Sequence, residues 1–165
     1  MNKFVAVLMG SDSDLSVMQN TLDTLKALGI AYEVRISSAH RTPKETHDYV
    51  LDADGRGCQV FIAAAGLAAH LAGAVAANTT KPVIGVPMDG GPLNGFDALL
   101  STVQMPAGVP VASVAIGKAG AKNAALLAAQ IIALSDQQLA EKLKQEKQAQ
   151  RAAVLAKNAG LINNV

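Results

Sequence analysis

The sequence predicts an α/β fold in which helices cover both faces of a parallel sheet. Along the chain, short apolar segments alternate with longer segments whose apolar residues recur at helical spacing. The first apolar segment, FVAVLM at residues 4–9, has no polar face, as expected of a strand that is buried on both sides. We therefore expect a flavodoxin-like three-layer α/β/α sandwich that spans residues 1–165 as a single domain and ends in an extended C-terminal helix.

The expected elements follow one another in order along the chain. Gly10 ends the first strand, and Gly29 ends the first helix, whose apolar stripe begins at Leu15. Further strands are expected at residues 32–37, 58–63, 83–86 and 111–116. Further helices are expected after residue 71 and up to 78, and at residues 43–53, 96–103, 119–134 and about 136–157.

Two of the expected helices begin with capping signals. Thr42 is a natural N-cap, Pro43 suits the first helical position, and Glu45 would complete a capping box. Ser135 is expected to cap the last helix, with Gln138 at the capping-box position. The helix at 119–134 is nearly all apolar, so we expect it to be buried on most sides.

Composition favours a globular, cytoplasmic protein. Hydrophobic residues make up 50% of the chain, and the net charge of +1 comes from evenly spread acids and bases, which excludes a disordered chain and the basic face of a nucleic-acid-binding protein. The single cysteine, Cys58, excludes a disulfide framework and favours a reducing compartment. The apolar segment at residues 3–9 is too short for a membrane span or a signal-peptide core. Ala-rich helices must pack closely, and some of their surfaces are expected to face other copies of the chain, although Ala is also simply a good helix former.

The most distinctive stretch is SSAHRTP at residues 37–43, between the second strand and the second helix. It carries a hydroxyl group (Ser38), an imidazole that titrates near neutral pH (His40) and a permanent cation (Arg41). It lies at the carboxyl end of a strand, where open α/β sheets bind ligands. A His beside an Arg can also be an ordinary solvated pair on the surface. Whether these residues form a site therefore depends on what the neighbouring loops carry.

The loop after the first strand is a candidate site for an anion and a sugar. Gly10 lets the backbone come close to a ligand, and Ser11, Ser13 and Asp14 lie at the start of a helix with free N–H groups. The alternative is that Ser13 only caps the helix and Asp14 only favours its dipole.

The loop at residues 64–71 follows the third strand and is built from small residues. It includes Gly66 and carries one polar side chain, His70, so it can form a tight apolar wall against a ligand. The alternative is a close-packed turn with a satisfied histidine.

The three loops together predict a site for a phosphorylated small molecule, with proton transfer by His40. The sequence has no metal-ligand spacing, Walker loop or dinucleotide fingerprint, so no metal or nucleotide cofactor is expected. Cys58 lies mid-strand, and His47, Lys118 and Lys122 are expected to be structural or surface residues.

Four segments together resemble the PurE family of purine biosynthesis. They are MGSDSD at 9–14, SAHRTP at 38–43, AAHL at 68–71 and GKAGAKNAALL at 117–127, and VQMP at 103–106 is similar as well. The match covers nearly the whole chain in order, and the C-terminal helix is its least distinctive part. Two residues beside the expected pocket depart from the family pattern: Leu67 stands where the family usually has Gly, and Ala72 where it usually has Pro.

The resemblance implies an isomerase of the bacterial type, which moves a carboxylate from N5 to ring carbon C4 of N5-carboxyaminoimidazole ribonucleotide and consumes no cofactor. It implies homo-octamers whose active sites lie between subunits. By the matching motifs, His40 is the general acid and base, Ser11, Asp14 and Arg41 bind the ribonucleotide, and Ser13 and Ser38 assist at phosphate and ribose. His70 and the small loop around it shape the carboxylate pocket, and Ala39, Gly66, Ala69 and Leu71 complete the substrate-binding set.

Two alternative functions remain open at this point. A second type in the family, a carboxylase that uses free carbon dioxide, commonly has Lys where Arg41 stands and lacks the AAHL loop, so Arg41 and His70 favour the mutase. A flavodoxin-like ligand-binding or signalling module would use the same sheet edge without turnover. A signalling receiver domain, however, needs an acidic cluster with a phosphorylatable Asp at a strand end, and the third strand here ends in Ala.

Overall fold

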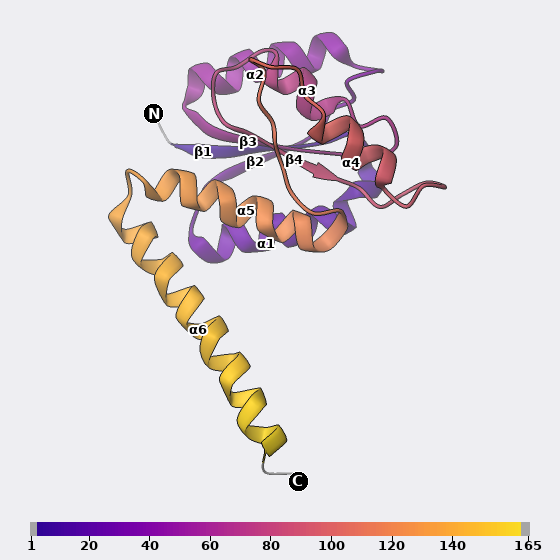
Figure 1. Cartoon of the computed structure of the whole chain (residues 1–165). Coiled ribbons are helices and arrows are strands. Elements are labelled where there is room, and N and C mark those ends of the chain that lie inside the picture. The colour runs from indigo at the N-terminus through magenta and orange to yellow at the C-terminus, as the bar shows by residue number, and fades with distance from the viewer. Residues whose placement is uncertain (1–2, 163–165) are drawn as a thin grey trace. The chain divides into compact units, whose positions relative to one another are not determined.

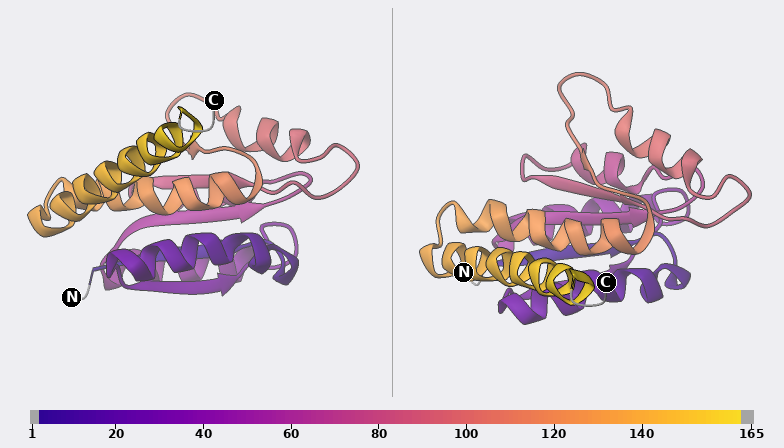
Figure 2. Two further views of the ribbon diagram at one scale, coloured as in Figure 1. Left: turned by 90° about the horizontal axis from the view of Figure 1, so that it is seen from below. Right: turned by 60° about the horizontal axis from the view of Figure 1, so that its bottom comes forward.

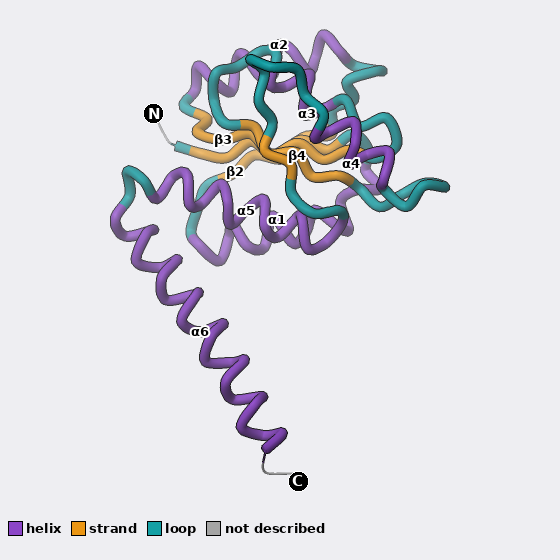
Figure 3. Tube along the Cα trace, in the orientation of Figure 1, coloured by secondary structure: helices purple, strands orange, loops and turns teal. Residues whose placement is uncertain are grey.

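A five-stranded, wholly parallel sheet forms the centre of the computed structural model, which describes residues 3–162 (Figures 1 and 3). The strands lie in the order β2-β1-β3-β4-β5. Their bounds are β1 Phe4–Met9, β2 Tyr32–Ile36, β3 Cys58–Ala65, β4 Val83–Pro87 and β5 Ala112–Ser113. The predicted α/β class and parallel sheet are confirmed.

Helices cover both faces of this sheet, which gives the predicted three layers. In Figures 1 and 2, α1 and the beginning of α5 lie on one face, and α2, α3 and α4 lie on the other. The helices are α1 Leu15–Leu28, α2 Pro43–Arg56, α3 Leu71–Ala76, α4 Phe96–Val103, α5 Gly117–Ala133 and α6 Gln137–Ile162, and a short 3-10 helix, η1, spans Asp12–Asp14. The chain divides between Ala128 and Ala129 into two compact units, and the sheet belongs to the first. Among the described helices, none has the length and apolar character that a membrane span requires.

The core explains why the sheet is central. All six residues of β1 are buried, and Phe61 and Ile62 of β3 are fully buried beside it. On one face, Ala121 and Ala124 of α5 are fully buried, and the Thr21 hydroxyl of α1 donates a hydrogen bond to the Ala121 carbonyl. A Cβ atom on Gly120 would lie 1.5 Å from the Ala115 carbonyl oxygen. The small residues of α5 therefore permit the close packing that the sequence predicted.

The parallel register brings four strand ends to one edge of the sheet. Met9 pairs with Ile36 of β2 and with Ala64 of β3, and Ala65 pairs with Pro87 of β4. The loops that follow β1, β2, β3 and β4 consequently meet at this edge, which is where the sequence placed the site.

Several predicted element bounds need correction. The fifth strand was expected at 111–116 but has two residues, because the chain leaves the sheet to begin α5 at Gly117, where φ is +73°. α2 continues past residue 53 to Arg56, supported by an ion pair between Asp52 and Arg56, and ends at Gly57 in the left-handed region. α6 continues past residue 157 to Ile162.

The predicted start of α2 is confirmed, with Thr42 at the N-cap position and Pro43 in the first turn, but neither predicted capping box forms. The Thr42 hydroxyl makes no capping bond to α2, because it is bonded to the backbone of Ser38 instead. Asp136, not Ser135, caps α6: its carboxylate accepts a hydrogen bond from the Leu139 N–H at 3.0 Å. α5 is also less enclosed than expected. Its buried residues form one stripe, and Lys122 and Asn123 on another side are exposed.

Candidate active site

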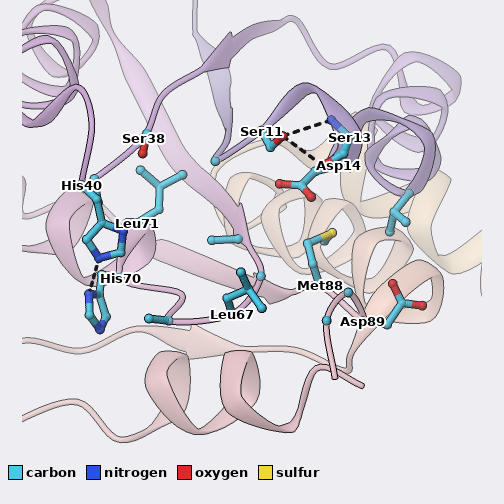
Figure 4. Close-up of a pocket in the computed structure, with 18 of the residues that line it drawn as sticks. Ser11, Ser13, Asp14, Ser38, His40, Leu67, His70, Leu71, Met88 and Asp89 are labelled. Atoms are coloured by element: carbon cyan, nitrogen blue, oxygen red, sulfur yellow. Dashed lines mark hydrogen bonds between the residues drawn. The ribbon is translucent and has the colours of Figure 1, made fainter. Parts of the chain in front are cut away.

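A cavity of about 810 Å³ lies at the carboxyl edge of the sheet (Figure 4). Its walls come from the loops after β1, β2 and β3, as the sequence predicted, and from a fourth loop after β4. Most of the predicted site residues line it, namely Ser11, Ser13, Asp14, Ser38, Ala39, His40, Arg41, Gly66, His70 and Leu71. The size is suitable for a small molecule.

One predicted residue lies elsewhere, and several lining residues were not predicted. Ala69 is buried behind the cavity wall, and its N–H donates a hydrogen bond to the Ser101 hydroxyl at 3.1 Å. Ala65, Leu67 and Ala68 belong to the loop that was expected to form an apolar wall, and they do line the cavity. The residues that sequence reasoning missed include Ser16, Val17, Met88, Asp89, Gly90 and Gly91. The loop after β4 could have been found by the same argument as the others, since it follows the end of a parallel strand.

The loop after β1 presents hydroxyl groups and a carboxylate to the cavity. The Ser11 hydroxyl accepts hydrogen bonds from the N–H and the hydroxyl of Ser13, at 3.3 and 2.9 Å, and donates to the carboxylate of Asp12. Neither Ser13 nor Asp14 makes a side-chain capping bond to α1. Burial raises the pKa of the Asp14 carboxyl, against the opposing effect of hydrogen bonds from Ser11 and Ser13. The Ser11 hydroxyl thus caps η1, whereas the Asp14 carboxylate makes no capping bond to α1 and lines the cavity, where it can meet a polar ligand.

Arg41 connects the loops after β1 and β2. Its Nη2 donates to the Gly10 carbonyl at 3.3 Å, and its Nε donates to the Ser38 hydroxyl at 3.4 Å. A guanidinium has five N–H donors, so these two bonds hold the group in place and leave donors for an anion in the cavity.

His40 and His70 form a hydrogen-bonded pair. His40 Nε2 lies 2.7 Å from His70 Nδ1, and the two rings meet edge to face with centroids 4.8 Å apart (Figure 4). One of these two nitrogens must carry a hydrogen and the other a lone pair. If both carried a hydrogen, two N–H groups would face each other. The bond therefore ties the tautomer of one ring to that of the other.

The two ends of the cavity differ in chemistry. Figure 4 shows the histidine pair at one end and Ser11, Ser13 and Asp14 at the other, with the apolar Leu67 in the lower middle and Met88 below Asp14. A ligand that spans the cavity would meet a titratable group at one end and hydroxyl and carboxylate groups at the other.

Leu67 carries a strained backbone. Its φ of +54° lies in the left-handed region, and its side chain rests on Gly91, where an added Cβ would lie 2.5 Å from a Leu67 methyl group. This contact joins the loops after β3 and β4 across the cavity. Ala72, the other departure from the family pattern, is buried in α3 and does not line the cavity.

Replacing Leu67 by glycine is expected to stabilise the fold by up to about 1 kcal/mol, because the left-handed conformation costs a non-glycine residue about 1–2 kcal/mol and glycine loses part of this gain through its unfolded-state entropy. Leu67→Ala keeps the strain and loses the contact with Gly91, so it is the matched control and should be less stable than the native protein. Thermal unfolding of the three proteins gives the order, and a Leu67→Gly variant that melts below Leu67→Ala would contradict the role of strain.

The remaining reactive residues lie outside the cavity. Cys58 is a free, buried thiol in β3, and burial raises its pKa to about 11. His47 is exposed on α2, as predicted. Within residues 3–162, no three His, Cys, Asp or Glu side chains are grouped so that they could hold a metal ion.

Comparisons with known proteins show the family to which this chain belongs. The family model described as AIR carboxylase matches residues 4–153. The N5-carboxyaminoimidazole ribonucleotide mutases of Pseudomonas aeruginosa and Bacillus subtilis are 55% and 50% identical to this chain, over 94% and 98% of it and 95% and 100% of their own lengths. The crystal structure of Treponema denticola PurE superposes with a TM-score of 0.87 at 30% identity, covering 96% of this chain and 98% of that one. The chain therefore belongs to the AIR carboxylase family, which confirms the resemblance to PurE that its motifs carry.

Proposed function

We propose that this chain is an isomerase of de novo purine biosynthesis, which converts N5-carboxyaminoimidazole ribonucleotide to 4-carboxy-5-aminoimidazole ribonucleotide. The observation that carries the proposal is the hydrogen-bonded pair of imidazoles, with Nε2 of His40 2.7 Å from Nδ1 of His70, in a cavity whose other groups suit a phosphosugar. Relatives of 50% identity or more over nearly the full length carry the mutase name.

The ribonucleotide would span the cavity. Arg41 would bind its phosphate by charge-assisted hydrogen bonds, with help from the hydroxyls of Ser13 and Ser38. Ser11 and Asp14 would bind the ribose hydroxyls, which a carboxylate accepts well. This arrangement directs the heterocycle toward the histidine pair.

The reaction needs one proton that is given and then recovered. Protonated His40 donates to N5, the N5–carboxyl bond breaks with its electron pair moving to N5, and carbon dioxide is released inside the cavity. C4 then attacks the carbon dioxide and forms the new carbon–carbon bond. His40 removes the proton from C4 and returns to its starting state, so atoms and charge balance without a cofactor.

His70 would support both proton transfers. Because its Nδ1 is bonded to Nε2 of His40, it fixes the ring orientation of His40 and determines which nitrogen carries the hydrogen. The small side chains of Ala65 and Gly66 and the apolar Leu71 would enclose the released carbon dioxide and keep it within reach of C4.

Supplying the two candidate substrates separately tests this function. With purified N5-carboxyaminoimidazole ribonucleotide we expect rapid conversion to the C4 isomer, and with aminoimidazole ribonucleotide and bicarbonate we expect little product. The opposite preference would identify the protein as the carboxylase that uses free carbon dioxide, and no turnover of either substrate would favour a binding module.

The enzyme is also proposed to assemble as a homo-octamer with shared sites in the cytoplasm, where a free thiol such as that of Cys58 stays reduced. In the single chain, Phe96, Leu100 and Val103 are exposed along one face of α4, at helical spacing. The Ser101 hydroxyl of the same helix accepts a hydrogen bond from the N–H of Ala69, in the loop that forms part of the cavity wall. A second copy on this face would therefore lie beside the cavity.

Light scattering is expected to give eight times the 16.9 kDa of one chain. Leu100→Glu should shift the protein to smaller species, because it places a charge in the apolar face of α4. Leu51→Glu is the matched control, since Leu51 is a similarly exposed leucine on α2 and should leave the assembly intact. A native protein with the mass of one chain would contradict the assembly.

A further inference from the structure

A chain of hydroxyl groups lies behind the turn that carries His40 and Arg41. Ser37, at the end of β2, and Thr46, in the first turns of α2, are both buried, and their hydroxyl oxygens are 2.6 Å apart. The Thr46 hydroxyl also donates to the Thr42 carbonyl at 2.8 Å. The Thr42 hydroxyl in turn accepts from the Ser38 N–H at 2.9 Å and donates to the Ser38 carbonyl at 3.1 Å.

The direction of each bond follows from counting hydrogens. A carbonyl oxygen can only accept, so the single hydrogen of Thr46 is used on the Thr42 carbonyl, and that of Thr42 on the Ser38 carbonyl. Ser37 must therefore be the donor in its bond to Thr46. All three hydroxyls have their hydrogens committed, so none can rotate without losing a bond.

The hydrogen bonds of these hydroxyl groups fix both ends of the turn. Ser38 is held through its N–H and its carbonyl by Thr42, and the Thr42 N–H donates to the same carbonyl at 2.8 Å. Only three residues, Ala39, His40 and Arg41, lie between these two ends. Thr42 does not line the cavity, so its effect on a ligand must pass through the turn.

We propose that Thr42 is a positioning residue: its hydroxyl holds both backbone groups of Ser38, its carbonyl is held by the Thr46 hydroxyl, and together these bonds set His40 at bonding distance from His70. His40 itself is exposed, so packing alone does not hold its ring. Because the Thr42 hydroxyl is bonded to the backbone of Ser38, it does not form the expected capping bond to α2. The catalytic part of this inference depends on the proposed function, whereas the geometric part does not.

The test compares Thr42→Val, which keeps the shape but removes the hydroxyl, with Thr42→Ser, which keeps the hydroxyl. Thr42→Val should lower kcat by at least about tenfold, since small misplacements of catalytic groups have effects of this size, and Thr42→Ser should restore most of it. Thr21→Val is the matched control: the Thr21 hydroxyl is fully buried, bonds a carbonyl and lies between α1 and α5, away from the cavity. It should lose stability but keep kcat.

A second measurement, by NMR, follows the hydrogen bond between His40 and His70 and does not depend on enzyme activity. The chain has three histidines, so ring-nitrogen NMR shifts can be assigned, with the exposed His47 as an internal reference. In Thr42→Val the signals of His40 and His70 should move toward those of independent imidazoles while His47 is unchanged. If Thr42→Val does not fold, Thr46→Val removes the next hydroxyl in the chain and should show the same two effects.

The outcomes separate the two proposals. If the native protein does not turn over the ribonucleotide but the His40 and His70 signals move as expected, the proposed function fails and the positioning role stands. If the native protein is active and the valine variant keeps both its kcat and its histidine signals, the positioning role is overturned and the function stands. A loss of kcat equal to that of Thr21→Val would also overturn it, because a general loss of stability would then explain the effect.

Discussion

Replacing His40 by asparagine is expected to lower turnover by a factor of about 10²–10⁴, the usual contribution of general acid–base catalysis, while the ribonucleotide still binds. Asparagine can hydrogen-bond to His70 in place of the imidazole, so the cavity keeps its shape. It cannot take up or release a proton near neutral pH, so neither N5 protonation nor C4 deprotonation is supported. Turnover with saturating substrate and a calorimetric dissociation constant measure the two effects separately.

Two further variants make this result specific. His47→Asn changes a histidine on the exposed surface of α2, outside the cavity, and should leave turnover unchanged. His70→Asn keeps a side chain at the partner position and should lower turnover less than His40→Asn, because His70 acts through His40. Near-native turnover in His40→Asn would remove that residue from the mechanism.

Strand positions and strand-end loops were predictable because they depend on local patterns. The all-apolar run at 4–9 and the glycine after it determine β1 almost without reference to the rest of the chain. Since parallel strands share one carboxyl edge, the loops that carry Asp14, His40 and His70 could be assigned to one site before any distance was known.

The histidine pair was not predictable from the sequence. His40 and His70 are 30 residues apart, and their bond depends on the register of β2, β1 and β3 together with the paths of two loops. A change of an ångström in either loop would break it. The sequence implied that His70 shapes a carboxylate pocket, whereas the geometry also gives it a direct contact with the proton-transfer group.

The wrong capping boxes have a related cause. A capping motif in the sequence indicates only that a hydroxyl is available near a helix start. It does not indicate which backbone group that hydroxyl will bond. The Thr42 hydroxyl bonds both backbone groups of Ser38, and these bonds exclude the cap that Thr42 and Glu45 would have formed.

Replacing Arg41 by alanine is expected to raise the dissociation constant of the ribonucleotide by about 10- to 150-fold, which corresponds to the roughly 1.5–3 kcal/mol typical of hydrogen bonds to charged groups. The guanidinium is held at the cavity by the Gly10 carbonyl and the Ser38 hydroxyl, so it is already oriented when the ligand arrives. Its loss removes both a positive charge and a fixed geometry. Because Arg41 takes no part in proton transfer, kcat at saturation should fall much less than in His40→Asn.

Arg41→Lys separates charge from geometry. Lysine keeps the positive charge but has no planar fork of donors, so it cannot bond Gly10 and Ser38 while also presenting paired N–H groups to a phosphate. Its dissociation constant, measured by calorimetry, should therefore lie between those of the native protein and Arg41→Ala. If Arg41→Ala binds the nucleotide as tightly as the native protein, then the phosphate lies elsewhere. The hydroxyl groups at the start of α1 would then have to hold the phosphate, and the heterocycle would have to be placed anew relative to His40.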